Sequence, residues 1–249
     1  MGLAKRIIPS LLVRGRVLVK GVAFDSWRSV GHAAQAVRVH QARGVDELLL
    51  LDVAATAEHR GPDLALVEEL SEDCFMPLAV GGGVRTVDDV RDLLKAGADK
   101  VVVNSAAIED PHLLRRLADT VGSQAIVASI DVREGSVYGR CGTKLTKFHP
   151  VWWAMRCQAR GAGEILLTSI EREGKLEGYD LQLVHDVSHA VQIPVIAAGG
   201  AGTYEHLLQA LKAGASAVAA GSMYQFLDLT PAGAARYLQD HGVEVRLTK

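Results

Sequence analysis

Residues 77–105 read PLAVGGGVRTVDDVRDLLKAGADKVVVNS, and this stretch decides the fold. Its pattern predicts a short apolar strand, a glycine turn, an amphipathic helix and a second strand. The pattern returns without a gap at residues 194–222, as PVIAAGGAGTYEHLLQALKAGASAVAAGS, at an offset of 117 residues. A repeat at a constant offset constrains the architecture, because both copies must form the same structural unit.

The repeat continues upstream at the same offset. GVDELLLLD from Gly44 aligns with GAGEILLTS from Gly161, so residues 44–105 and 161–222 are two copies of one strand-helix-strand-helix-strand unit. One further apolar run precedes each copy, RIIPSLLV in the first half and AIVASIDV in the second. Near-continuous apolar strands that alternate with helices are typical of parallel sheets covered on both faces.

Eight such strands in two matching halves predict one (β/α)8 barrel, a TIM-barrel fold that commonly needs about 250 residues. We predict a single domain over residues 1–249, with half-barrels of about 1–122 and 123–249. A doubly wound open sheet is the competing fold, but it does not explain a two-fold repeat with equivalent glycine turns. The predicted strands are 6–12, 48–52, 78–80, 100–104, 125–132, 165–169, 195–198 and 217–220. The predicted helices include 33–43, 63–73, 86–96, 111–120 and 150–160.

Two connecting segments are unusually long. Residues 13–32 are polar and glycine-punctuated, and we predict a functional loop there, because long loops in compact domains usually carry function. Residues 133–149 predict a hairpin-like excursion rich in glycine and basic residues. Thr86, with Asp89 three residues on, predicts a helix cap, and Pro111 predicts the first turn of another helix.

Composition excludes several classes of protein. The formal net charge is −2 with both signs interspersed, which argues against a nucleic-acid partner. No signal-peptide pattern is present and no apolar run approaches the ~20 residues of a membrane helix, so we expect a cytoplasmic protein without membrane contact. Cys74, Cys141 and Cys157 lack metal-ligand spacing and predict free thiols. His185 and His189 lie one helical turn apart without a third ligand, so we expect neither a metal nor a cofactor.

The glycine turns predict where a ligand binds. In a (β/α)8 barrel the active site lies at the C-terminal ends of the strands. Glycine turns that lead into helix N-termini let a phosphate approach free backbone N–H groups. We therefore predict two phosphate sites related by the repeat, suited to a ligand with a phosphate at each end. The first consists of Gly82, Gly83 and Ser105, and the second of Gly200, Gly202, Gly221 and Ser222.

Between the two predicted phosphate sites, Asp131 ends a strand and is a candidate general acid or base. Its repeat partner is Leu12, which cannot transfer a proton. Asp52 and Asn104 end neighbouring strands and can orient a ligand. Lys20 could hold a phosphate, although a solvated loop charge is the simpler interpretation.

The opposite end of the barrel is predicted to be charged. Four strand starts carry a charged residue: Arg6, Glu47, Lys100 and Glu164. Buried charges must be paired or solvated, so these four predict either an ion-pair network that closes the barrel or a gate to a passage along its axis.

These residues resemble the cyclase subunit of imidazole glycerol phosphate synthase, the HisF family, over nearly the whole chain. The resemblance rests on AKRIIP, DELLLLD, GGGVRTVDDVRDLLKAGADKVVVNSAA, GSQAIVASIDV, GAGEILLTSI, GYDL, PVIAAGGAG and ASAVAAGSM. It implies that a HisH-like glutaminase docks at the barrel bottom and that ammonia passes the charged gate. It further implies that a phosphorylated ribulosyl nucleotide reacts at the top to give imidazole glycerol phosphate. It adds Thr168, Glu173 and Gly178 to the residues expected to bind substrate.

Departures from the family pattern lie at the substrate end. The family uses two catalytic aspartates, and Leu12 stands where the first belongs. Glu171 and Glu173 replace customary aspartates, and Lys147 replaces a glycine. Together with the segment DCFMPL, these departures resemble a HisF-like branch that helps supply ammonia to an amidotransferase that makes acetamidino sugars. They favour that ammonia-delivering role, with the histidine-pathway cyclase as the alternative.

Overall fold

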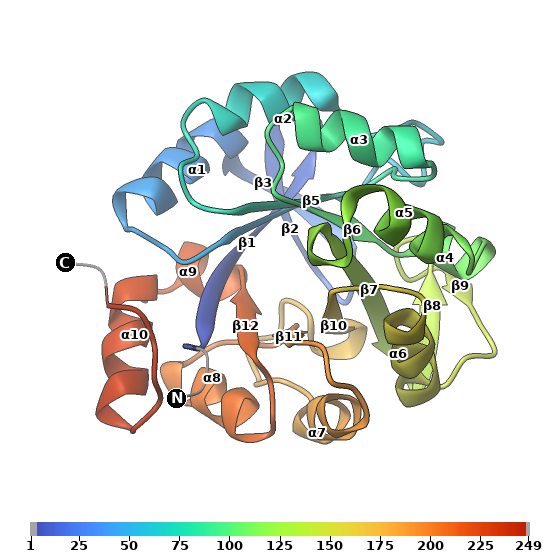
Figure 1. The fold of residues 1–249 in the computed structure, drawn as a ribbon. Helices are drawn as coiled ribbons and strands as arrows, with labels where there is room; N and C mark the ends of the chain where they lie inside the picture. Colours follow the sequence, from blue (N-terminus) through green and yellow to red (C-terminus); the bar gives the residue numbers. More distant parts are fainter. Residues whose placement is uncertain (1–3, 248–249) are drawn as a thin grey trace.

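The barrel is built from eight parallel strands. The computed structural model describes residues 4–247. Its barrel strands are β1 (Arg6–Arg14), β4 (Leu48–Asp52), β5 (Leu78–Gly81), β6 (Lys100–Val103), β7 (Ile126–Arg133), β10 (Glu164–Ser169), β11 (Val195–Ala198) and β12 (Ala217–Ala220). Each strand pairs with the next in this order, and β12 pairs with β1, so the sheet is closed (Figure 1). The predicted (β/α)8 barrel is confirmed.

Helices surround the closed sheet (Figure 1). The longer ones are α1 (Ala33–Ala42), α2 (Leu64–Ser71), α3 (Val87–Lys95), α5 (Leu113–Val121), α6 (Pro150–Ala159), α7 (Leu181–Ala190), α8 (Tyr204–Lys212) and α10 (Pro231–Asp240). Two short helices, α4 (Ser105–Glu109) and α9 (Ser222–Phe226), follow β6 and β12 at the repeat offset. None of the helices in residues 4–247 is long and apolar enough to cross a membrane.

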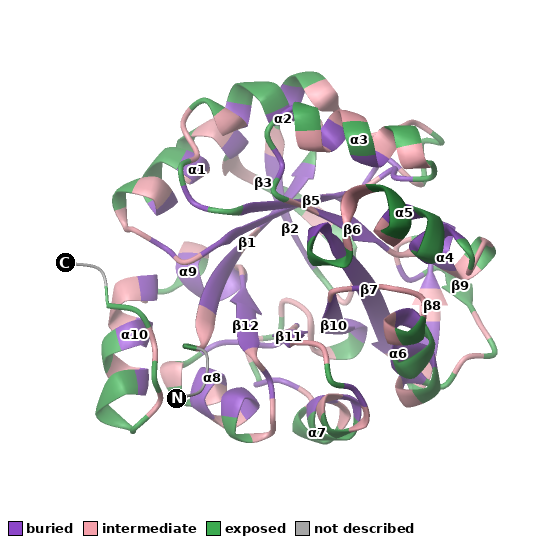
Figure 2. Ribbon diagram, in the orientation of Figure 1, coloured by how far each residue is buried: buried purple, intermediate pink, exposed green. Residues whose placement is uncertain are grey.

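Apolar side chains fill two separate regions. One lies between the strands and the helices, which turn buried faces inward and exposed faces outward (Figure 2). The other fills the barrel itself with residues that include Ile8, Leu49, Val102 and Leu166. The barrel interior is therefore a packed core below the strand ends, which confines a bulky ligand to the mouth.

The strand register confirms that Leu12 and Asp131 occupy equivalent places. Leu12 pairs with Leu51 of the next strand, and Asp131 pairs with Thr168 of its own next strand. Leu51 and Thr168 correspond at the repeat offset. Leucine at position 12 and aspartate at position 131 therefore differ at two matched positions of one barrel.

The helix starts follow the sequence in most places. Thr86 accepts a hydrogen bond from the Asp89 N–H, and the Asp89 carboxylate accepts one from the Thr86 N–H, so the predicted cap is confirmed. The prediction for Pro111 was wrong: α5 begins at Leu113, two residues later. The separate short helix α4 occupies the chain just before this point, so Pro111 lies in the link between two helices.

The prediction of a loop over residues 13–32 was also wrong. Strand β1 runs on to Arg14, turns at Gly15 and continues as β2 (Val17–Val22) and β3 (Asp25–His32). These strands pair antiparallel beyond the barrel rim, with irregular register between β2 and β3. Gly15 adopts φ +56°, which allows the tight turn. Residues 133–149 form the predicted hairpin, with β8 (Ser136–Gly139) and β9 (Lys144–Leu145).

Candidate active site

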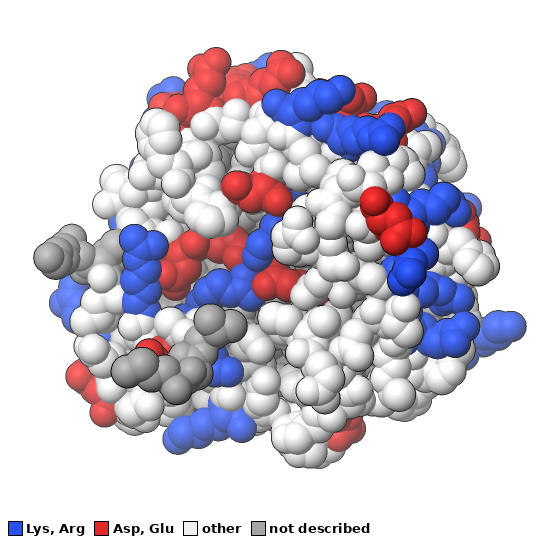
Figure 3. All heavy atoms as spheres, viewed as in Figure 1, with Lys and Arg blue, Asp and Glu red and all other residues white. Residues whose placement is uncertain are grey.

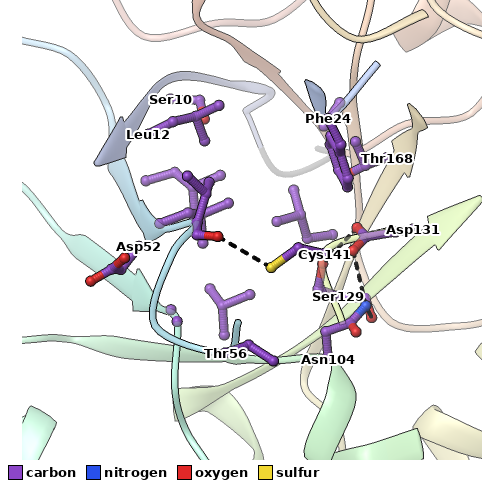
Figure 4. Close-up of a pocket in the computed structure, with 18 of the residues that line it drawn as sticks. Ser10, Leu12, Phe24, Asp52, Thr56, Asn104, Ser129, Asp131, Cys141 and Thr168 are labelled. Carbon is purple, nitrogen blue, oxygen red and sulfur yellow. Dashed lines mark hydrogen bonds between the residues drawn. The ribbon is translucent and has the colours of Figure 1, made fainter. Parts of the chain in front are cut away.

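A cavity lies at the C-terminal ends of the barrel strands, where the fold places an active site. Predicted site residues that line this central cavity are Asp52, Gly82, Gly83, Asn104, Ser105, Asp131, Thr168 and Glu173. Leu12 and Asp131 lie on opposite sides of it (Figure 4). Phe24 and Trp27, from the antiparallel extension, complete the wall. The predicted loop therefore does reach the site, but as part of a folded sheet.

Asp131 is held by a short hydrogen-bond network (Figure 4). Asn104 Nδ2 donates to its Oδ2 over 3.1 Å, and Ser129 Oγ donates to its Oδ1 over 3.2 Å. Burial raises the pKa of Asp131 to about 7, against the opposing effect of the Ser129 and Thr168 hydroxyls. A carboxyl group that titrates near neutral pH and is aimed into a cavity is suited to general acid–base work.

The Asp52 carboxylate positions neighbouring groups of the protein. Its Oδ1 accepts hydrogen bonds from the Ala54 and Ala55 N–H groups, at 3.0 and 3.1 Å. Its Oδ2 pairs with Arg60 Nη1 at 2.7 Å, and this contact raises the pKa of Arg60. With both oxygens engaged, Asp52 holds the turn after β4 and places Arg60 beside the first glycine turn.

The first glycine turn opens into a second, cationic cavity. It shares Gly83 and Ser105 with the central cavity, so the two adjoin. Its other walls bring Arg60, Arg85 and Arg140 to the turn. Arg140 also pairs at 2.7 Å with Glu109, the one carboxylate among the residues that line this cavity. Arginine is the side chain best suited to bidentate phosphate contacts. This arrangement supports the predicted anion site and adds three cations that the sequence reading missed.

The second glycine turn lines a third cavity. Gly200, Gly221 and Ser222 line it as predicted, whereas Gly202 and Gly178 do not. The Gly202 N–H donates to His206 Nδ1 at 3.2 Å. The Gly178 N–H donates to the Gly200 carbonyl at 2.8 Å. These two glycines therefore hold the turn through hydrogen bonds from their backbone N–H groups and do not line the cavity.

The structure corrects the interpretation of Lys20 as a solvated loop charge. A solvated loop charge was the simpler interpretation, yet the residue is only 2% exposed. Its Nζ donates to the Ser10 carbonyl at 3.0 Å, and a Cβ atom on Gly221 would lie 2.1 Å from that nitrogen. Burial lowers the pKa of Lys20 to about 8, with Glu173 opposing the shift. Because residues 13–32 form strands, Lys20 is carried inward behind the third cavity.

The departures from the family pattern separate into two groups. Leu12 and Glu173 line the central cavity. Glu171 and Lys147 are exposed, and Glu171 accepts a hydrogen bond from the Glu134 N–H at 3.2 Å. Only the first pair of changes can contact a ligand in this cavity.

Cys141 also lines the central cavity, which the sequence reading did not foresee. Its Sγ lies 3.4 Å from the Val53 carbonyl (Figure 4). Burial raises the pKa of this thiol to about 11, so it stays protonated at neutral pH. Cys74, Cys141 and Cys157 are all free thiols, as predicted.

The four charged strand starts form one closed ring at the other end of the barrel. Arg6 pairs with Glu47 at 2.5 Å and with Glu164 at 2.7 Å. Lys100 pairs with the same two glutamates at 3.0 and 2.9 Å. Charged side chains of both signs lie side by side near the middle of the face in Figure 3. The predicted ion-pair network is present, and its role as a gate stays a prediction.

Gly200→Ala should destabilise the second turn severely. Gly200 adopts φ +108°, and a Cβ atom there would lie 2.1 Å from the Gly178 carbonyl oxygen. The backbone conformation alone costs a non-glycine residue about 1–3 kcal/mol. The control is Gly135→Ala, where φ is +71° but a Cβ atom would meet nothing within 4 Å. Denaturant unfolding should show a larger loss for Gly200→Ala, and equal losses would contradict the close approach.

Fold and site together define a two-fold (β/α)8 barrel with adjoining cavities at its mouth. The chain matches the family described as histidine biosynthesis protein over residues 6–229. It is 45% identical to the imidazole glycerol phosphate synthase subunit HisF of Chlorobium phaeobacteroides (strain BS1), over 98% of this chain and 100% of that protein. The HisF subunit of Dictyoglomus thermophilum is 44% identical over 98% of this chain and 99% of its own length. That of Caulobacter vibrioides (strain NA1000 / CB15N) is 47% identical over 98% and 97%.

The chain therefore belongs to the histidine biosynthesis protein family, within its HisF relatives. The three relatives are named for imidazole glycerol phosphate synthase and not for acetamidino sugars. They favour the histidine-pathway alternative over the ammonia-delivering role in sugar amidination that the departures indicated.

Proposed function

We propose that this chain is the cyclase subunit of an imidazole glycerol phosphate synthase. It takes ammonia from a HisH-like glutaminase and combines it with a ribulosyl nucleotide that carries a phosphate at each end. The names of its relatives support this activity. The observation that carries the proposal is the row of three adjoining cavities, with a glycine turn at each outer end.

The geometry suits a long ligand with two anionic ends. Ser10, Ala198 and Glu173 line both the central and the third cavity, just as Gly83 and Ser105 line both the central and the cationic cavity. One ligand can therefore contact both glycine turns and pass Asp131 between them. In this proposal the two turns bind the phosphates, and Asp131 acts on the atoms in between.

The charged ring supports a partner at the opposite end. Arg6, Lys100 and the two glutamates satisfy one another there, without a hydrogen bond to a cavity residue. In our proposal the glutaminase docks over this ring and ammonia passes through it along the barrel axis. The apolar interior above the ring would exclude water from that route.

Sugar amidination is kept as a second candidate because of one residue. Leu12 occupies the place of a catalytic aspartate, and a barrel without that group could deliver ammonia to an amidotransferase instead of using it. In that case the top cavity would bind a different phosphorylated ligand or none.

One assay separates the two candidates. We would measure turnover of the ribulosyl nucleotide with ammonium salts, and again with glutamine and the glutaminase partner. The cyclase predicts imidazole glycerol phosphate in both assays. Glutaminase stimulation without any product would exclude the cyclase and favour ammonia delivery.

A further inference from the structure

The central cavity holds one carboxylate whose role is open. Among residues 4–247, the carboxylates that line it are Asp52, Asp131 and Glu173. Asp52 is held by Arg60 and two backbone N–H groups. Asp131 accepts hydrogen bonds from Asn104 and Ser129. The Glu173 carboxylate makes no hydrogen bond or ion pair with any residue of this described range.

The backbone of Glu173 is nevertheless firmly placed. It follows the short 3-10 helix η2 (Ile170–Arg172), directly after β10. Its N–H donates to the Ser169 and Ile170 carbonyls at 3.1 and 3.2 Å, and its carbonyl accepts from the Ala23 N–H at 2.9 Å. The backbone is thus held between a barrel strand and the antiparallel extension, and the residue lines both the central and the third cavity. A fixed backbone with an uncommitted carboxylate is the arrangement that a proton-transfer group needs.

We propose that Glu173 supplies the acid–base group that position 12 lacks, so that Glu173 and Asp131 form the working pair of this barrel. This inference rests on the proposed function, because it concerns the attack of ammonia on a carbonyl carbon. Leu12 and Asp131 occupy matched strand positions, and leucine brings no titratable group to the cavity that both residues line. Glu173 returns a carboxylate to the same cavity from the loop after β10.

The hydrogen bonds assign the two roles. Donors to a carboxylate favour its charged form, so Asp131, with two donors, is the base. Glu173 has none from residues 4–247, and burial raises its pKa against the opposing charge of Lys20, so its neutral form is favoured and it is the acid. In the step, the ammonia nitrogen bonds to the carbonyl carbon and gives one proton to Asp131. The electron pair of the carbonyl bond moves to oxygen, which takes one proton from Glu173, and a carbinolamine results.

The surroundings of Glu173 agree with this assignment. Burial raises its pKa, and Lys20 opposes the shift. The other titratable groups that face it are Asp131 and Tyr179, whose own pKa values it raises. Because Asp131 and Glu173 interact, the two apparent pKa values of the pH–rate profile belong to the pair. Activity should rise with pH as the base ionises and fall again as the acid loses its proton.

The test is steady-state turnover of the ribulosyl nucleotide with ammonium for Glu173→Gln. A positioned proton-transfer group is typically worth ~10²–10⁴-fold in rate, so kcat should fall by that order with little change in KM. Glu173→Asp should keep part of the activity. The matched control is Glu171→Gln in the same loop, which is exposed and should retain wild-type turnover. The high-pH limb of the profile should disappear only in Glu173→Gln.

A second variant tests the substitution idea itself. The double variant Leu12→Asp/Glu173→Gln should turn over at least tenfold faster than Glu173→Gln alone, because a carboxylate returns to the cavity. Turnover of Glu173→Gln within about threefold of wild type would overturn the inference while leaving the cyclase intact. A rise in KM alone would also overturn it, because it would make Glu173 a binding residue. If the wild type makes no product at all, the proposed function itself fails, and this inference fails with it.

Discussion

Asp131→Asn should lower turnover by ~10²–10⁴-fold, the range expected when a positioned proton-transfer group is lost. The change keeps the shape of the side chain: its single amide oxygen can accept from Asn104 Nδ2, and its NH2 group can donate to Ser129 Oγ. In wild type, kcat/KM should fall as the pH drops through about 7, where Asp131 becomes protonated and can no longer act as a base. The variant should lose that limb. Asp186→Asn, on the exposed face of α7, is the control that should change neither rate nor profile.

Asp131→Asn should lower turnover but raise the free energy of unfolding. Burial raises the pKa of Asp131 from 3.8 to about 7, so the folded state binds this proton more tightly than the unfolded state does. The contribution of this proton to the free energy of unfolding is fully present below pH 3.8. It is lost as the pH rises to about 7. Asp131→Asn avoids this loss and should gain about 2–3 kcal/mol relative to wild type between pH 5 and pH 8. Equal pH dependence in the two proteins would show that Asp131 is not buried as a neutral acid.

Much of the fold could be predicted because the repeat and the strand pattern are local signals. An offset of 117 residues places equivalent glycines, caps and strand ends without knowledge of any long-range contact. Lys20 shows where this reasoning fails. Glycines and polar residues made its segment resemble a loop, and only pairing with β1 turns the lysine inward. Pairing between antiparallel strands depends on the partner strand, which the local sequence does not contain.

The sequence predicted the site residues that end strands, but not those that come from turns and hairpins. Strand-end residues such as Asp131 and Asn104 follow directly from the barrel topology, which fixes where strands end. Cys141, Arg85 and Arg140 come from turns and hairpins, and their meeting at the cavities depends on how those loops fold back. The sequence signal for Arg140 is the cluster of basic residues in the hairpin over residues 133–149.

Glu47→Gln should destabilise the protein by about 3–5 kcal/mol, because it breaks a largely buried ion-pair network on one side. The Glu47 side chain is only 3% exposed, and its two oxygens accept from Arg6 and Lys100. Removing its charge leaves two cations to share Glu164. The control is Glu69→Gln, which removes an exposed pair with Arg16 and should cost about 0–1 kcal/mol. Denaturant unfolding measures both, and similar small losses would show that the ring is solvated.

The Glu47 variant also separates the two interpretations of the ring. A network that only closes the barrel predicts that turnover with ammonium salts and turnover with glutamine fall together in Glu47→Gln, in proportion to the folded fraction. A gate predicts a selective change in the glutamine-dependent reaction, because ammonia from the partner must pass between Glu47, Arg6 and Lys100, whereas ammonium from solution can enter at the mouth. The ratio of the two rates, measured on folded protein, is therefore the deciding quantity. An unchanged ratio would leave the ring with a structural role alone, since the altered charge would then have no effect on passage.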